Sequence, residues 1–216
     1  MRTLAQQVVG LLRTDLINGV FAPGQYLNEG QLAADYGISR GSLREALRLL
    51  EHQGLLSRVT HRGVFVREFS PGDIESIFRV RFALETEAAR RAAGRLTDPT
   101  REALEKRLLD IGSAEESSAP PERVRADFAF HEAICDASGN HILADVWGSL
   151  TGPIMAAMIT AGPELLGPLQ TVAFHRPLLE AIYSKDEREI RVAFESHFAQ
   201  SAAAMTPPVS HESRSS

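Results

Sequence analysis

Residues 27–51 read LNEGQLAADYGISRGSLREALRLLE, and this stretch decides the fold of the N-terminal part. Asn28 is suited to cap a helix, and Gln31 stands three residues later, the spacing of a capping box. Gly37 ends that helix, and Ser39 can cap a second one, which Gly54 closes. The second helix carries apolar residues at helical spacing, namely Leu43, Ala46, Leu47 and Leu50. Two short amphipathic helices joined by a tight turn predict a helix-turn-helix.

The flanking residues extend this motif to a winged helix-turn-helix. Upstream, residues 4–18 show helical periodicity, and Gly19 stops the helix. Downstream the period changes, because residues 56–60 and 64–67 read as short strands with His61-Arg62-Gly63 as the hairpin tip between them. Three helices followed by a hairpin are predicted to form one DNA-binding domain over residues 1–69.

Residues 70–205 predict a second domain that is purely helical. Ser70 or Asp73 can cap its first helix, and Pro71 suits a first helical turn. Helices are expected at about 71–94, 98–116, 121–138, 141–161, 168–185 and 187–205, with a loop at 117–121 and a kink or break at Gly152-Pro153. We therefore expect a mainly α chain, in which a winged helix-turn-helix with a small β-hairpin wing precedes an all-α helical bundle. The polar tail 206–216 is predicted to be disordered.

Composition and charge limit the classes of protein that fit. Of the 216 residues, 44% are hydrophobic and 24% are charged, as in ordinary globular proteins. Cys135 is the single cysteine, which excludes an internal disulfide framework and indicates a cytoplasmic location, and the absence of a long apolar run predicts no membrane span. The net charge of −5 belongs to the C-terminal part, because residues 1–69 hold eight Lys and Arg against six Asp and Glu.

A cationic stripe marks the second helix of the motif as a candidate DNA-reading helix. Arg40, Arg44 and Arg48 follow one another at four-residue spacing, opposite the buried leucines. Arginine can donate bidentately to guanine or clamp phosphates, so double-stranded DNA is the expected partner. Further candidate contacts are the short donors at the helix start, Ser39 and Ser42, and the hairpin tip formed by His61, Arg62 and Gly63. The alternative is a solvated face in which Glu45 and Glu51 pair with the arginines, but the turn and the wing favour DNA binding.

The N-terminal motifs resemble the DNA-binding domain of the GntR family of bacterial regulators. The resemblance covers residues from about 4 to 68 and rests on LNEGQLA at 27–33, YGISR at 36–40, LREALRLLE at 43–51 and RGVFV at 62–66. It implies that Arg40 and Arg44 contact bases or phosphates and that the wing near Arg62 assists. This chain departs from some relatives at Gly30, where they carry an arginine that touches DNA.

In the C-terminal part, polar residues interrupt the apolar stripes of three helices. Asp127 and His131 lie one turn apart on the buried side of one helix, and His175 and His197 lie on the apolar faces of two others. Burying these groups without partners would cost several kcal/mol, and one divalent metal ion of the Zn, Ni or Mn class would satisfy them together. The alternative is that each histidine is an ordinary core residue with its own hydrogen bond.

A buried arginine interrupts the first helix of the bundle. Arg81 falls on the face defined by Ile74 and Phe78, with Glu85 one turn on. Such an arginine needs an anionic partner. The partner is either an acidic side chain such as Glu85 or the carboxylate of a bound ligand.

These features resemble the FadR-type effector domain of GntR regulators, the FCD form, over residues from about 71 to 204. The resemblance rests on Arg81-x3-Glu85, Asp127-x3-His131, the Gly139-Asn140 turn, His175 before a leucine-rich run, and His197. It implies a dimeric helical bundle whose metal is held by Asp127, His131, His175 and His197. It also implies a small organic acid as effector, with Arg81 and Asn140 as candidate effector ligands.

Together these observations predict a transcription regulator, with repression as the expected mode, whose operator affinity is controlled by a small carboxylate effector. One winged helix contacts few base pairs, so we expect a homodimer that reads a pseudo-palindromic operator. Two alternatives remain open. In one the metal itself is the signal, and in the other the chain is a metal-dependent enzyme, although no HExxH or nucleophile-elbow pattern is present.

Overall fold

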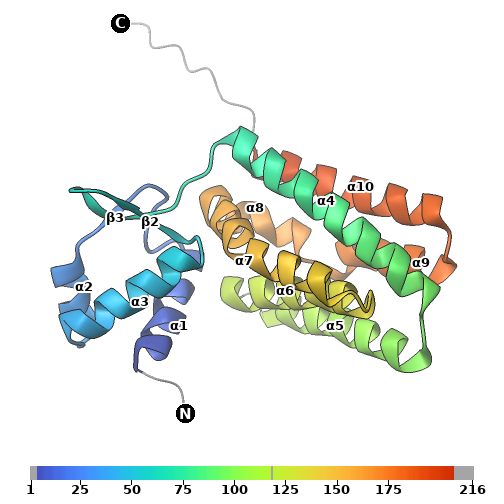
Figure 1. The fold of residues 1–216 in the computed structure, drawn as a ribbon, viewed down its shortest axis with the longest axis horizontal. Coiled ribbons are helices and arrows are strands. Elements are labelled where there is room, and N and C mark those ends of the chain that lie inside the picture. The colour runs from blue at the N-terminus through green and yellow to red at the C-terminus, as the bar shows by residue number, and fades with distance from the viewer. Residues whose placement is uncertain (1–3, 118, 207–216) are drawn as a thin grey trace, which may run out of the picture.

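The computed structural model describes residues 4–117 and 119–206 and divides them into two parts (Figure 1). The first part is a winged helix, with elements in the order α1 (Leu4–Ile17), β1 (Tyr26–Leu27), α2 (Glu29–Asp35), α3 (Arg40–His52), β2 (Leu56–Val59) and β3 (Gly63–Val66). The second is a helical bundle made of α4 (Pro71–Gly94), α5 (Asp98–Ser117), α6 (Pro120–Ala137), α7 (His141–Ala161), α8 (Pro163–Leu166), α9 (Val172–Ser184) and α10 (Glu187–Met205). The chain is mainly helical, as its sequence predicts.

The predicted caps form the ends of the winged-helix elements. The side chain of Asn28 accepts hydrogen bonds from the backbone N–H groups of Gly30 and Gln31, so α2 begins where expected. The reciprocal half of the predicted capping box does not form, because Gln31 donates to Asp35 instead. Ser39 accepts from the N–H of Ser42 at the start of α3. Both helices are therefore capped at their N-terminal ends by the side chains that the sequence predicts.

A small antiparallel sheet forms the wing, with strand order β1-β3-β2. In the structure, β2 and β3 end at Val59 and Val66, each one residue before the end that the sequence predicts. Strand β1 has only two residues, too few to show an alternating pattern in the sequence. Gly63 has a φ of +103°, and a Cβ there would lie 2.6 Å from the ring of Tyr26 on β1. The wing therefore requires glycine at this position.

In the bundle, α4 and α10 lie side by side, and α5 and α6 form its opposite edge in Figure 1. Ser70 and Asp73 form a reciprocal capping box at the start of α4. The core is aromatic, with Phe78, Trp147 and Phe194 among its fully buried side chains. The α7 helix is long and apolar enough to pass for a membrane span, but it buries Trp147 and packs against α4, α6 and α10, as the core helix of a bundle does.

The structure corrects three expectations in the bundle. The loop expected at 117–121 is shorter, because α5 continues to Ser117 and α6 begins at Pro120, where proline suits a first turn. The helix expected at 168–185 is broken, since a 3-10 turn at Gly167–Leu169 precedes α9, which Thr171 caps. Pro153 lies inside α7, which remains one helix from His141 to Ala161, so of the two alternatives expected at Gly152-Pro153 the break does not occur.

The winged helix touches the bundle where α3 ends. In Figure 1, α7 and α8 lie on the side of the bundle that faces α3. Gly54, just after α3, packs against the ring of Pro153, and a Cβ on Gly152 would lie 1.4 Å from the carbonyl oxygen of Gln53. Arg13 of α1 donates to the side chain of Gln53 at 2.6 Å. The Gly152-Pro153 step therefore seats the end of the candidate reading helix directly on α7.

Candidate functional site

The α3 helix separates a buried leucine side from an exposed arginine side. Leu43, Leu47 and Leu50 are completely buried. Arg40, Arg44 and Arg48 are exposed along the other side, as their four-residue spacing requires. The structure therefore brings the predicted cationic stripe to one open face.

Acidic side chains form ion pairs with arginines on this cationic face, but the pairs are not those that helix spacing suggests. Arg44 Nε lies 2.8 Å from an oxygen of Glu29, at the start of α2. Arg58 of β2 reaches the same carboxylate at 3.6 Å and Glu51 at 3.1 Å. A hollow of about 550 Å³ is lined by these four residues and Arg48. Sequence reasoning missed Arg58, whose only signal is its exposed position on a strand next to the recognition motif.

The other DNA-binding candidates border α3 and the wing. Ser39 and Ser42 lie at the start of α3, where their hydroxyl oxygens are 2.9 Å apart. His61 at the hairpin tip has a φ of +61°, an unusual value for a side chain other than glycine. Arg62 lies over the ring of Phe65, 5.7 Å from its centre, which supports its side chain on the wing.

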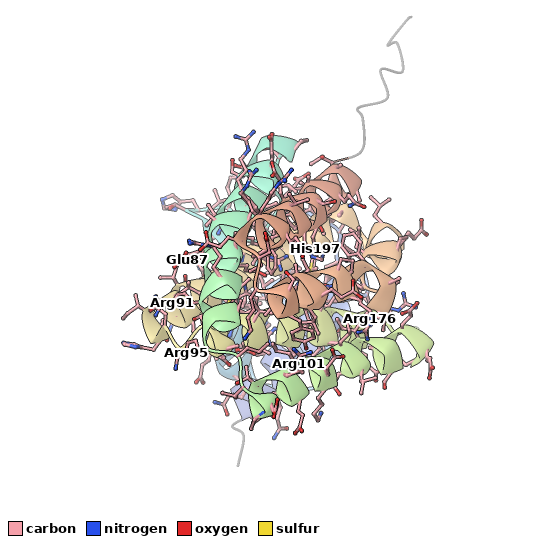
Figure 2. All side chains as sticks on the ribbon, turned by 90° about the vertical axis from the view of Figure 1, so that its right-hand side faces the viewer. Glu87, Arg91, Arg95, Arg101, Arg176 and His197 are labelled. Carbon is pink, nitrogen blue, oxygen red and sulfur yellow. The ribbon has the colours of Figure 1, made fainter. Side chains whose placement is uncertain are left out.

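The bundle interior brings three histidines together from α6, α9 and α10. Ligand nitrogens of His131, His175 and His197 lie within 4.8 Å of one another. His131 and His175 are fully buried and His197 is 5% exposed. Figure 2 labels His197 among the side chains that α10 carries into the bundle. Asp127, the fourth predicted ligand, is also buried, and its Oδ1 lies 3.1 Å from His175 Nε2.

One ring nitrogen of each histidine makes a hydrogen bond to a carboxylate or to the backbone. His131 Nδ1 lies 2.5 Å from Glu85 Oε2, and His175 Nδ1 lies 3.0 Å from the carbonyl oxygen of Thr171. The backbone of Phe174 hydrogen-bonds His197. Such partners fix the tautomer, so the second nitrogen of each neutral ring carries a lone pair.

The second nitrogens face the cluster with no donor in reach. Among the described residues, His131 Nε2 and His197 Nδ1 are buried without any hydrogen-bond partner. His175 Nε2 faces an oxygen of Asp127 at 3.1 Å, and two acceptors at that distance repel unless a proton or a cation lies between them. Three imidazole nitrogens and one carboxylate form the donor set of a borderline divalent metal. The residues present therefore fit a metal ion.

The electrostatics of the cluster favour the neutral imidazole that binds metals. Burial lowers the pKa of His197 well below its usual value, and His131 and His175 lower it further. Burial likewise lowers the pKa of His131. Ligands must be deprotonated to bind a metal, so these histidines need not release a proton first.

Glu85 joins the cluster to α4 and α7. Its Oε1 accepts from Arg81 Nε at 2.9 Å and from Trp147 Nε1 at 2.9 Å, while its Oε2 contacts His131. Burial acts to raise the pKa of Glu85, but its contacts with His131, Arg81 and Trp147 outweigh burial and lower the pKa to about 2. The acidic partner of Arg81 is thus a side chain of this chain, one of the two alternatives. The sequence indicates the Arg81–Glu85 pair but not Trp147, which only the fold brings there.

Arg81 is buried, with its Nε bonded to Glu85. It lies between two aromatic rings, 5.5 Å from the centre of Phe78 and 4.8 Å from that of Phe198. Outside these rings, α4 and α10 form a groove of about 570 Å³ lined by Phe78, Phe82 and Phe198. The side chain of Asn140 caps α7, and within the described residues no contact joins it to the histidines, so its role as an effector ligand stays a prediction.

Comparisons with known proteins agree with this architecture. The FCD domain matches residues 76–200, and the family described as bacterial regulatory proteins, gntR family, matches residues 4–66. The transcriptional regulator LutR of Bacillus subtilis is 28% identical over 204 residues, 87% of this chain and 90% of LutR. A probable D-xylose utilization operon transcriptional repressor of Paenarthrobacter nicotinovorans is 29% identical over 212 residues, 97% of this chain and 90% of that protein. The structure of McbR/YncC from E. coli superimposes with a TM-score of 0.72 and 25% identity, covering 95% of this chain and 98% of McbR.

A winged helix-turn-helix joined to a helical bundle is the architecture of a transcription regulator. The chain belongs to the GntR family of bacterial regulators and carries an FCD domain. It is a regulator and not an enzyme, which removes the enzymatic alternative.

Proposed function

We propose that this regulator is a cytoplasmic repressor of the FadR subfamily that binds DNA as a homodimer and responds to a small organic acid. The winged helix, residues 1–69, reads the operator through α3 and the wing. The bundle, residues 70–205, holds one divalent metal and the effector. Repression is supported by the relative from Paenarthrobacter nicotinovorans, which is named a probable transcriptional repressor.

DNA binding rests on the exposed side of α3. Arg40, Arg44 and Arg48 present guanidinium groups that can bind guanine edges or phosphates, with Ser39 and Ser42 as short donors at the helix start. His61, Arg62 and Gly63 at the wing tip contact the neighbouring backbone or minor groove. Two such heads in a symmetric dimer select a pseudo-palindrome.

The metal centre carries the proposal for ligand control. The decisive observation is that His131 Nε2 and His197 Nδ1 are buried without partners while His175 Nε2 faces Asp127. Asp127, His131, His175 and His197 would hold the ion, and a bound metal supplies a Lewis acid that a carboxylate can bind. Glu85, Thr171 and Phe174 keep the three rings in their ligand orientation.

The effector is a small carboxylate held between the cluster and α4. Arg81 donates a hydrogen bond to Glu85 through Nε, and among the described residues no partner is bonded to its two terminal nitrogens. A carboxylate that binds both the metal and this guanidinium fork would link α4 to α6, α9 and α10. Because α4 begins directly after the linker from the winged helix, such a link can change how the reading heads are held.

A ligand screen tests this proposal. Purified protein is heated with a panel of organic and sugar acids, with and without added Zn²⁺, Ni²⁺ or Mn²⁺, and the melting temperature is recorded. An acid that binds the folded state raises the melting temperature by mass action, and we expect this to require metal. The same acid should change the affinity for a duplex that the protein selects from a random-sequence pool. If no acid acts but the metal alone changes DNA affinity, the metal itself is the signal, which is the second candidate function.

A further inference from the structure

We propose that Glu29 is a positioning residue for DNA recognition, which holds Arg44 so that its outer nitrogens meet the operator. This inference rests on the proposed DNA-binding function and adds to it a residue that makes no DNA contact of its own. An acidic side chain on a surface that binds a polyanion requires an explanation, because by charge alone it weakens binding.

The geometry of the Glu29–Arg44 pair leaves the reading edge of the arginine open. Glu29 Oε2 contacts Arg44 Nε at 2.8 Å, and within the described residues no partner is bonded to the two terminal nitrogens. A guanidinium group bonded through Nε–H keeps open the outer edge formed by its two terminal nitrogens, and the donors of this edge match guanine or phosphate. The side chain of Arg44 remains 63% exposed, so the pair does not withdraw it from solvent.

Glu29 is held in place by its surroundings, and a residue that positions another side chain requires this. It is the first residue of α2, next to the Asn28 cap, and α2 packs on α3 through the buried Leu32 and Ala33. Its second oxygen lies 3.6 Å from Arg58, whose Nε is held by Glu51. One carboxylate therefore connects α2, the reading helix and the strand that leads to the wing.

Gly30 lies next to a second arginine of α3. A Cβ at Gly30 would lie 3.9 Å from Arg40 Nη2, an ordinary contact distance, so the guanidinium of Arg40 lies beside the start of α2. Arg40 and Arg44 thus both project from α3 past the first turn of α2. We infer that the start of α2, with its glycine and its glutamate, sets the positions of both arginines.

The pair contributes little to folding, which makes the proposal testable by substitution. Both side chains are partly exposed, and exposed ion pairs of this kind contribute little to the stability of the fold. Glu29→Gln should therefore leave the fold intact. The two explanations of Glu29 predict opposite changes in DNA affinity. If Glu29 acts only through its negative charge, Glu29→Gln strengthens DNA binding. If Glu29 positions Arg44, the substitution weakens binding to the specific sequence.

The experiment compares Glu29→Gln with Glu45→Gln in the full-length protein. Glu45 is exposed one residue beyond Arg44 on the same helix, and among the described residues no bond involves it, so its substitution removes the same charge without a pair. The probes are a duplex that the unmodified protein selects from a random-sequence pool and a scrambled duplex of equal length. Affinity is measured by fluorescence anisotropy at several salt concentrations, and circular dichroism checks the fold.

We expect Glu29→Gln to weaken binding to the selected duplex by about tenfold or more, the loss expected of an impaired bidentate contact. Binding to the scrambled duplex should be unchanged or tighter, and Glu45→Gln should not weaken either. In an Arg44→Ala background, Glu29→Gln should cause no further loss. Equal or tighter binding of Glu29→Gln to the selected duplex overturns the positioning role. Failure of the unmodified protein to select any sequence instead contradicts the proposed function itself.

Discussion

At the scale of single residues, burial decides how strongly the loss of one partner of a charged pair destabilises the fold. Two arginine–glutamate pairs of α4 have four-residue spacing, Arg81–Glu85 in the interior and Arg79–Glu75 on the surface. The distances are similar, at 2.9 Å and 2.6 Å, but the side chains of the first pair are 3% and 0% exposed and those of the second 78% and 56%. Removing one partner of a buried pair leaves an uncompensated charge in a poorly solvated site.

We predict that Glu85→Gln lowers the free energy of unfolding by about 3 kcal/mol or more, because Arg81 loses its counter-charge. The matched surface change, Glu75→Gln, should cost less than about 1 kcal/mol. Urea denaturation of both variants measures the difference. Similar costs for the two substitutions would show that Glu85 is not the partner that keeps Arg81 in the interior.

Sequence reasoning reached the site residues whose partners are local and missed those whose partners are distant. The four-residue spacings of Arg81–Glu85 and Asp127–His131 are visible in the sequence because a helix places them on one face. The contacts of Arg44 with Glu29 and of Trp147 with Glu85 join different helices. No pattern within one helix encodes them, since they depend on how the helices cross.

At the scale of elements, caps and glycines account for what could be predicted. Asn28, Ser39 and Ser70 begin their helices as expected, because a side chain that accepts from the first free N–H groups is a local signal. The sequence does not predict the 3-10 turn before α9, although Gly167-Pro168 lies inside this turn. The reason is that the apolar period continues across the turn. Strand β1 exists only because β3 pairs with it.

The contact between α3 and α7 gives a prediction from two glycines on one helix. Gly148 has open space where a Cβ would lie, whereas at Gly152 that space is filled by the carbonyl of Gln53. Gly148→Ala should raise helix stability by about 0.5–1 kcal/mol. Gly152→Ala should open the contact, lower the melting temperature and speed amide hydrogen exchange at residues 50–54. If both variants behave alike, the end of α3 does not rest on α7.

At the scale of the whole molecule, two routes connect the buried cluster to the reading helix. One follows α4 to the linker, and the other passes from Glu85 through Trp147 along α7 to the Gly152-Pro153 step beneath α3. A ligand that binds at the cluster can change DNA affinity only if it prefers one arrangement of these parts, typically by about 1–3 kcal/mol. The winged helix therefore needs no direct contact with the ligand.

Elemental analysis of the purified protein tests whether Asp127, His131, His175 and His197 bind one divalent metal ion inside the bundle. After incubation with Zn²⁺, Ni²⁺ or Mn²⁺ and removal of free metal, the protein should retain about one ion per chain, as one cluster of ligands predicts. The His175→Ala/His197→Ala double variant should retain none. Stoichiometric metal in the double variant, or no metal in the unmodified protein after loading, would contradict the account.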